Sequence, residues 1–203
     1  MDIKTAIEET KKYIYKSYEA TEMKIGPNIY RGHLRALSTE IEDSIALFVT
    51  NILPNCKAFL DPSIYLDGTN NRPDLLIVDE NNDVFAMIEI KSNMGWCRNA
   101  KSVIDNIINN DLKFRNEGKL KCEFSREESQ TIYYGDKVKL FLIALTDGNC
   151  STKNHIINKQ YAKTTKVYQF NLFSGWYGEL EDCEIKDFAE ALLDGEIEWK
   201  KIR

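Results

Sequence analysis

The stretch RPDLLIVDENNDVFAMIEIKSN, from Arg72 to Asn93, places charged residues within an otherwise apolar pattern. Two apolar runs, 73–78 and 84–91, flank the polar segment DENND, which predicts two β-strands joined by a turn. Asp74 stands near the start of the first run, and Glu89 and Lys91 stand at the end of the second. We therefore expect a hairpin whose charged side chains gather at one end.

A turn between Asn81 and Asn82 would determine which residues of the hairpin face each other. Asn accepts a positive φ more readily than most residues, so this pair is an acceptable turn centre. In that register Asp74 lies opposite Glu89, with Cβ atoms about 5 Å apart. Lys91 returns to the same face because side chains alternate along a strand. The alternation predicts Phe85 and Met87 on this face too, and Ala86, Ile88 and Ile90 on the other.

Two carboxylates this close repel each other and favour a bound cation. Oxygen ligands at this spacing suit Mg²⁺, which keeps several waters and is often completed by phosphate oxygens. Such a metal binds the scissile phosphate and lowers the pKa of an attacking water. The Lys91 ammonium can orient that water or neutralise charge in the transition state. We therefore expect phosphodiester hydrolysis with Mg²⁺, for which Mn²⁺ can substitute.

Pro73-Asp74, fourteen intervening residues and then Glu89-Ile90-Lys91 resemble the PD-(D/E)XK motif of a nuclease superfamily that includes type II restriction endonucleases. The resemblance implies a restriction endonuclease-like α/β fold, a mixed central β-sheet flanked by helices, with its core from about residue 31 to 146. It also implies that Asp74, Glu89 and the Ile90 carbonyl bind the metal, that Lys91 is the catalytic lysine, and that the substrate is DNA.

Members of this superfamily usually contribute one more acid from the preceding helix, here predicted from about Arg31 to Leu53. At about 100° per residue, Glu42 borders the apolar face of that helix, whereas Glu40 and Asp43 point away from it. Glu42 is therefore the predicted additional metal-binding and catalytic acid. The alternative is that all three acids are solvated.

The element order and composition favour one domain over residues 1–203, with net charge -5 and no signal peptide or membrane helix. We expect a cytoplasmic protein with no membrane partner, whose five cysteines are reduced thiols. The predicted order is α-α-β-β-α-β-β-α. Further elements beyond the central hairpin are predicted as helices over 3–18, 97–114 and 185–195, and strands over 137–146 and 166–173.

Two basic stretches, 113–121 and 153–166, read individually as solvated loops, yet together they offer a DNA-binding face despite the acidic total. The segment DGTNNR, 67–72, is predicted to be a flexible loop entering the site. His33 and His155 lack partners at metal-ligand spacing, and Trp96 is expected to pack at the rim of the core.

The biological role has several readings. The first is a Mg²⁺-dependent DNA endonuclease, such as a type II restriction endonuclease, and double-strand cleavage would favour a homodimer. The second is a repair, recombination or mobile-element nuclease. The others are a catalytically inactive nucleic-acid-binding module and an unrelated α/β domain with an incidental salt-bridge cluster.

Overall fold

A computed structural model describes residues 1–22, 38–93, 100–124, 128–148, 150–175 and 179–194. Within them, a six-stranded mixed sheet has the order β1-β4-β5-β8-β9-β10. Its strands are β1 (Lys57–Leu60), β4 (Leu75–Val78), β5 (Val84–Asn93), β8 (Lys139–Thr146), β9 (Val167–Ser174) and β10 (Glu181–Asp182). The adjacent strands β5, β8 and β9 are parallel, and the remaining pairs are antiparallel. The predicted mixed α/β sheet is therefore confirmed.

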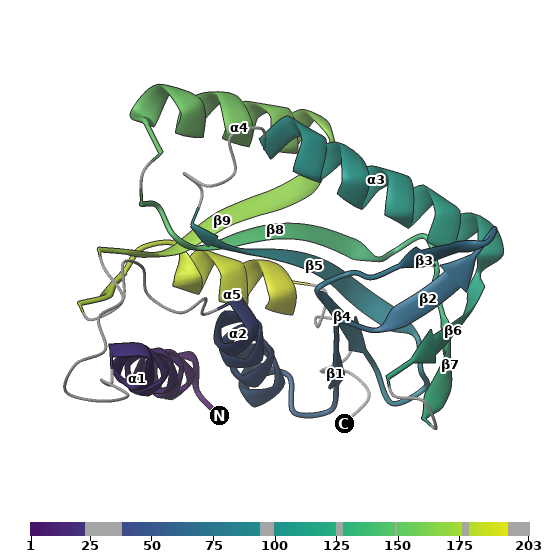
Figure 1. The fold of residues 1–203 in the computed structure, drawn as a ribbon, viewed down its shortest axis with the longest axis horizontal. Helices are drawn as coiled ribbons and strands as arrows, with labels where there is room; N and C mark the ends of the chain where they lie inside the picture. Colours follow the sequence, from purple (N-terminus) through teal and green to yellow (C-terminus); the bar gives the residue numbers. More distant parts are fainter. Residues whose placement is uncertain (23–37, 94–99, 125–127, 149, 176–178, 195–203) are drawn as a thin grey trace, which may run out of the picture.

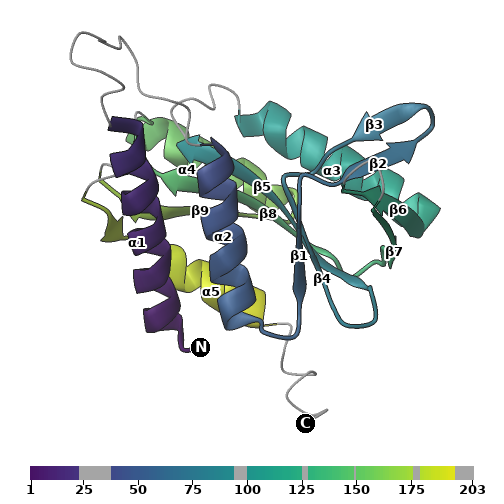
Figure 2. The same cartoon turned by 60° about the horizontal axis from the view of Figure 1, so that its bottom comes forward.

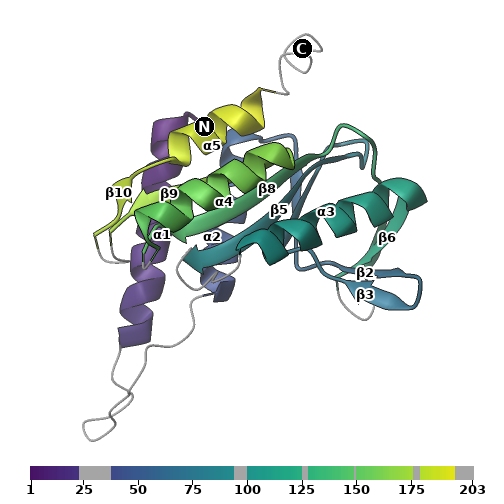
Figure 3. The ribbon, with the colours of Figure 1, turned by 90° about the horizontal axis from the view of Figure 1, so that it is seen from above.

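Helices cover both faces of this sheet (Figure 1). One face carries α1 (Ile3–Glu22), α2 (Ser38–Ile52) and α5 (Ile185–Leu193). The opposite face carries α3 (Ala100–Glu117) and α4 (Thr152–Thr164), which lie side by side in Figure 3. Each face has its own apolar cluster, and the alternating side chains of the strands contribute to both.

The strand β8 shows why this arrangement buries its central strands. Seven of its eight residues are buried, as expected for a parallel strand covered by helices on both sides. Helix α2 presents Ile41, Ile45 and Phe48 to the sheet at the predicted helical spacing, and all three are buried. Its predicted first turns, 31–37, lie outside the described residues.

A second, smaller antiparallel sheet was missed by the sequence analysis (Figure 2). Its order is β3-β2-β6-β7, and its strands are β2 (Ser63–Leu66), β3 (Thr69–Asn71), β6 (Lys119–Glu123) and β7 (Ser129–Tyr133). The predicted flexible loop 67–72 is therefore wrong in part, because Thr69–Asn71 is paired with β2. The short β1 and β10 were also missed.

The basic stretches are not solvated loops. Residues 153–166 form most of α4, which begins where the Ser151 hydroxyl accepts a hydrogen bond from the Asn154 N–H at 3.3 Å. Residues 113–121 form the last turn of α3 and the first part of β6. Ala162 is the buried residue of α4, which explains why the apolar pattern there is weak.

Four of the cysteines, Cys56, Cys122, Cys150 and Cys183, form no disulfide among the described residues and are reduced thiols as predicted, while Cys97 lies outside the described residues. No helix in the described part of the chain has the length and apolar character needed to cross a membrane.

Candidate active site

The hairpin of β4 and β5 brings Asp74 and Glu89 together in the predicted register. Leu75 pairs with Ile88 and Leu76 with Met87, so Asp74, one residue before β4, is opposite Glu89. On the side of β4 away from β5, the Asp74 carbonyl accepts a hydrogen bond from the Asp61 N–H at 2.9 Å, just after β1. Its carboxylate Oδ2 accepts a further bond from the Ile90 N–H at 2.6 Å.

The predicted two-residue turn is wrong, although the register at the site is correct. Asp79 N–H donates to the Asp83 carbonyl at 3.0 Å, which closes a three-residue loop, Glu80–Asn82. Val78 then pairs with Val84, and an irregularity in the ladder leaves Phe85 as an extra residue on β5. The loop shifts the register by one residue and the bulge shifts it back.

The bulge also overturns the predicted position of Phe85. Phe85 packs against the cluster under α1, α2 and α5, whereas Met87 belongs to the cluster under α3. The centre of the Phe85 ring lies 5.3 Å from the Lys139 ammonium. Phe85 therefore does not share a face with Met87.

The Lys91 ammonium lies at the point where the predicted ligands converge. Its Nζ is 2.7 Å from Glu89 Oε1, 3.0 Å from the Ile90 carbonyl oxygen and 3.6 Å from Asp74 Oδ2. The three side chains are partly exposed, with between 23% and 32% of each side chain accessible. A cation at the surface thus already has two carboxylates and one carbonyl around it.

Electrostatics at the site oppose a second negative charge. The pKa of Glu89 is raised, first by burial and then by the charge of Asp74, while the Lys91 ammonium acts in the opposite direction. One added positive charge would stabilise both carboxylates in their ionised form.

The third predicted acid, Glu42, approaches this group from α2. Burial raises its pKa to about 7, with further contributions from the charges of Asp74 and Asp61, and Lys91 partly offsets them. The charges of Asp74, Asp61 and Lys91 therefore reach Glu42, which places it near this group.

Glu40 and Asp43 lie on the side of α2 that faces α1. The hydroxyl of Tyr13, on α1, donates a hydrogen bond to Asp43 Oδ2 at 3.3 Å. Burial raises the pKa of Tyr13, and the charges of Asp43 and Glu40 raise it further. The predicted rotation of the helix thus separates Glu42 from the other two acids, although Asp43 contacts α1 and is not simply solvated.

Asp61 and Arg72 form an ion pair beside the site that the sequence analysis missed. Asp61 follows β1 in a left-handed conformation, with φ of 46°. It is thirteen positions before Asp74 and outside the motif, and the only signal for it was its position before Pro62, which marks a turn. Its partner Arg72 is the last residue of the predicted loop 67–72.

The oxygen donors of the site are of the kind that Mg²⁺ accepts. Among the described residues no three His, Cys, Asp or Glu side chains form a group that could hold a metal ion. The site instead offers two carboxylates and the Ile90 carbonyl, and Mg²⁺ is commonly held by one or two carboxylates plus waters and phosphate oxygens. These three oxygens surround the Lys91 ammonium, so a metal would take the place of that ammonium.

The cations of the first basic stretch are mostly engaged. Arg115 Nε lies 2.7 Å from Asp111 Oδ2, and Lys121 Nζ lies 2.8 Å from Glu123 Oε1. Lys113 donates to the Asn71 amide oxygen at 3.4 Å, which ties α3 to the end of β3. These cations of the first basic stretch therefore all have partners within the protein.

The remaining predicted residues add little to the site. His155 lies on α4 with its Nδ1 3.2 Å from the Asn171 amide nitrogen. His33 and Trp96 lie outside the described residues.

No protein-family model matches the sequence, and no curated protein matches it either.

Proposed function

We propose that this protein is a Mg²⁺-dependent DNA endonuclease with a restriction endonuclease-like fold. The observation that carries the proposal is the convergence of Asp74, Glu89 and the Ile90 carbonyl on one cationic nitrogen. The elements α2, β4, β5, α3 and β8 follow one another along the chain with β1 to β3 and β6 to β7 inserted between them, and they support the proposal, because a helix–hairpin–helix–strand order is what the resemblance implies for the core.

In this proposal Asp74, Glu89 and the Ile90 carbonyl would hold the metal. Bound there, Mg²⁺ would lower the pKa of a water and neutralise charge on the phosphate. Lys91 would release its two carboxylate partners and direct its ammonium to the phosphate, where negative charge develops.

Glu42 would handle the proton of the attacking water. A carboxylate with a pKa of about 7 is half ionised near neutral pH, which suits a general base. Its position on the Asp74 side of α2 gives it access to a water held at the site.

The first prediction tests the chemistry directly. We expect purified protein to cut plasmid DNA with Mg²⁺ or Mn²⁺ and not with EDTA. Asp74→Ala, Glu89→Gln and Lys91→Ala should each lower the cleavage rate by about a hundredfold or more, since each removes a charge at the reacting phosphate. Agarose gels give the rates, and thermal melting checks that the variants fold.

Glu123→Gln and Lys121→Ala are matched controls, because this pair joins residues two apart on one strand, as Glu89 and Lys91 do, but lies on β6. Normal cutting by Glu89→Gln, or by the parent protein in EDTA, would contradict the proposed metal-dependent mechanism. DNA binding without any cutting would favour an inactive binding module of the same fold.

A further inference from the structure

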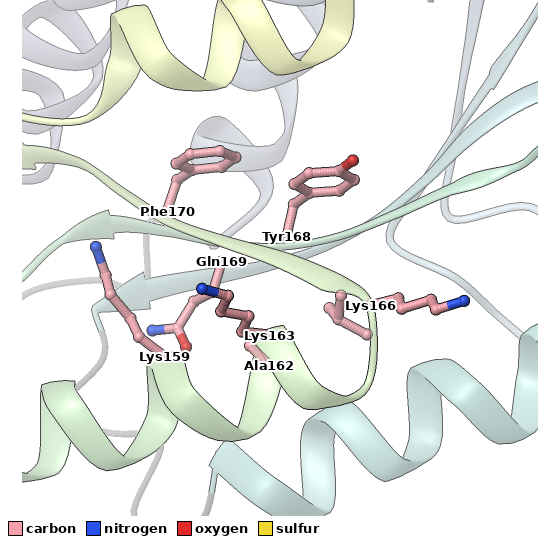
Figure 4. A pocket seen from close by; sticks show the side chains of 8 residues that line it. Lys159, Ala162, Lys163, Lys166, Tyr168, Gln169 and Phe170 are labelled. Atoms are coloured by element: carbon pink, nitrogen blue, oxygen red, sulfur yellow. The ribbon is translucent and has the colours of Figure 1, made fainter.

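A pocket of about 460 Å³ lies between α4 and the beginning of β9 (Figure 4). Its lining is formed by Lys159, Ala162, Lys163, Lys166, Val167, Tyr168, Gln169 and Phe170. This volume is within the usual range for a small-molecule site. The pocket is separate from the residues assigned to cleavage, and the proposed function does not use it.

Gln169 gives the pocket an unmet hydrogen-bonding requirement. Only 8% of the residue is exposed, and neither its amide nitrogen nor its amide oxygen has a partner within the described part of the chain. In Figure 4 its side chain extends from β9 toward α4, between Lys159 and Lys163. Buried amides are normally hydrogen-bonded, so a ligand with an adjacent donor and acceptor would satisfy both atoms at once.

The edge of β9 adds backbone groups to the same place. In the described residues, β10 pairs only with Phe173 and Ser174, so the earlier half of β9 has no neighbour on that side. The Asn171 N–H points to this edge, where it donates to Glu184 Oε2 at 2.7 Å. Residues two apart on a strand direct their backbone groups to the same side, so the Gln169 N–H and carbonyl also face the open edge.

The charge of the pocket is positive. Lys159 forms an ion pair with Glu184, whereas Lys163 and Lys166 have no ion pair within the described residues. Both are exposed, and they belong to the pocket lining near the end of α4 and just before β9. The pocket therefore favours an anionic ligand with a flat, hydrogen-bonding body.

We propose that this pocket binds one unpaired nucleotide. A nucleobase edge presents the adjacent donor and acceptor that the Gln169 amide lacks, as in amide–base pairs. The apolar Ala162 and Val167 would contact the base, and Lys163 and Lys166 would bind the phosphate. A base can lie within the pocket only after it leaves the stack.

A peptide strand added to β9 fits the pocket less well. The open part of the edge, Val167–Phe170, is shorter than the five or six residues typical of a strand. Backbone pairing would also leave the Gln169 side-chain amide without a partner.

The pocket and the candidate active site lie on one row of the sheet. Glu89 pairs with Leu142, and Leu142 pairs with Gln169, so the two Cα atoms are separated by two strand spacings, roughly 10 Å. One nucleic acid strand can therefore contact both. Contact of one strand with both sites rests on the proposed function, whereas nucleotide binding by the pocket alone does not.

The experiment measures binding without cleavage. Fluorescence polarisation of a labelled single-stranded oligonucleotide is followed with the full chain in EDTA, across a series of salt concentrations. We expect Lys163→Ala/Lys166→Ala to weaken binding about tenfold or more and to reduce the salt slope by about 0.7, since the two lysines share one phosphate and each phosphate contact on a single strand contributes about 0.7. Lys153→Ala, which removes an exposed lysine of the same helix outside the pocket, is the matched control.

Gln169→Leu tests recognition of the base. We expect the parent protein to prefer an oligonucleotide with its bases over one of abasic residues, and Gln169→Leu to lose that preference while keeping the salt slope. Gln160→Leu removes an exposed amide of α4 and should change neither property. Thermal melting of Gln169→Leu separates this effect from unfolding.

The outcomes distinguish the ligand sources. Binding of free nucleoside 5′-monophosphates that depends on Gln169 identifies a free nucleotide, and binding of oligonucleotides alone identifies a nucleic acid strand. Equal affinity of the parent and pocket variants for both ligands overturns the inference, as does lysine-dependent binding of an acidic peptide without any nucleotide binding. Because the assay contains no divalent metal, a failure of the nuclease proposal leaves this result unaffected.

Discussion

At the scale of single residues, the role of Glu42 rests on which way its helix is turned. We expect Glu42→Gln to lower the cleavage rate by about a hundredfold or more and Glu40→Gln to change it little, because the charges of Asp74 and Lys91 act on Glu42, whereas the charge of Glu40 acts on Tyr13 of α1. Both variants preserve shape and remove one charge from the same helix. Cleavage rates of the two variants at the same Mg²⁺ concentration measure the difference. A lower rate for Glu40→Gln than for Glu42→Gln would show that α2 turns Glu40, and not Glu42, toward the site.

The stability of the protein should also respond to Glu42. Its folded pKa of about 7 lies above the ordinary value of 4.5, so its contribution to stability is fully present below pH 4.5 and is lost as the pH rises through 7. Glu42→Gln stays neutral. In EDTA, its melting temperature relative to the parent protein should therefore rise between pH 5 and 8.

The expected rise is about 2–4 °C, equivalent to about 1 kcal/mol for a chain of this size. The full shift in pKa would give more, but Glu42 is only half-buried and solvent screens part of the interaction. Calorimetry across this pH range measures it. An equal rise for Glu40→Gln would mean that the effect comes from the charge of the whole helix.

At the scale of elements, the hairpin shows how much of the site could be predicted. The pairing of Asp74 with Glu89 was predicted from a two-residue turn that the structure does not have, and it is correct because the bulge at Phe85 offsets the shift that the three-residue loop introduces. The loop was not predicted. The buried Asp79 accepts hydrogen bonds from the Asn81 and Asp83 N–H groups at 2.8 Å each, which is a local side-chain preference that periodicity does not report.

The missed elements have a common physical cause. The strands β2, β3 and β7 are short and half exposed, so their residues do not alternate clearly, and α4 buries only Ala162. Tertiary contacts determine these elements more than local pattern does. The long buried β8 and the amphipathic α2, by contrast, were predictable.

The loop conformation gives an element-scale prediction. Asn82 has φ of 68°, a region in which a β-branched residue is strained. Asn82→Val should lower the free energy of unfolding by about 2 kcal/mol, from this strain and from the lost hydrogen bond with Gln130. Asn81→Val, in the same loop, should cost much less. Urea denaturation measures both, and equal costs would contradict the assigned turn.

At the scale of the whole molecule, the central strands connect the two apolar clusters. On β8, Leu142 belongs to the cluster under α3 and α4, and its neighbour Ile143 belongs to the cluster under α1, α2 and α5. Loss of either cluster would remove the cover from one face of every central strand. The two sides should therefore not unfold independently.

This connection predicts one cooperative unfolding transition and tests whether the chain is a single domain. Phe114 and Phe188 are both fully buried, one in each cluster. Phe114→Ala and Phe188→Ala should each lower the free energy of unfolding by about 3–5 kcal/mol. Urea denaturation followed by far-ultraviolet and by near-ultraviolet circular dichroism should give coincident curves in both variants. If Phe188→Ala instead separated the curves into two transitions, with only one of them shifted, the two faces of the sheet would be independent units.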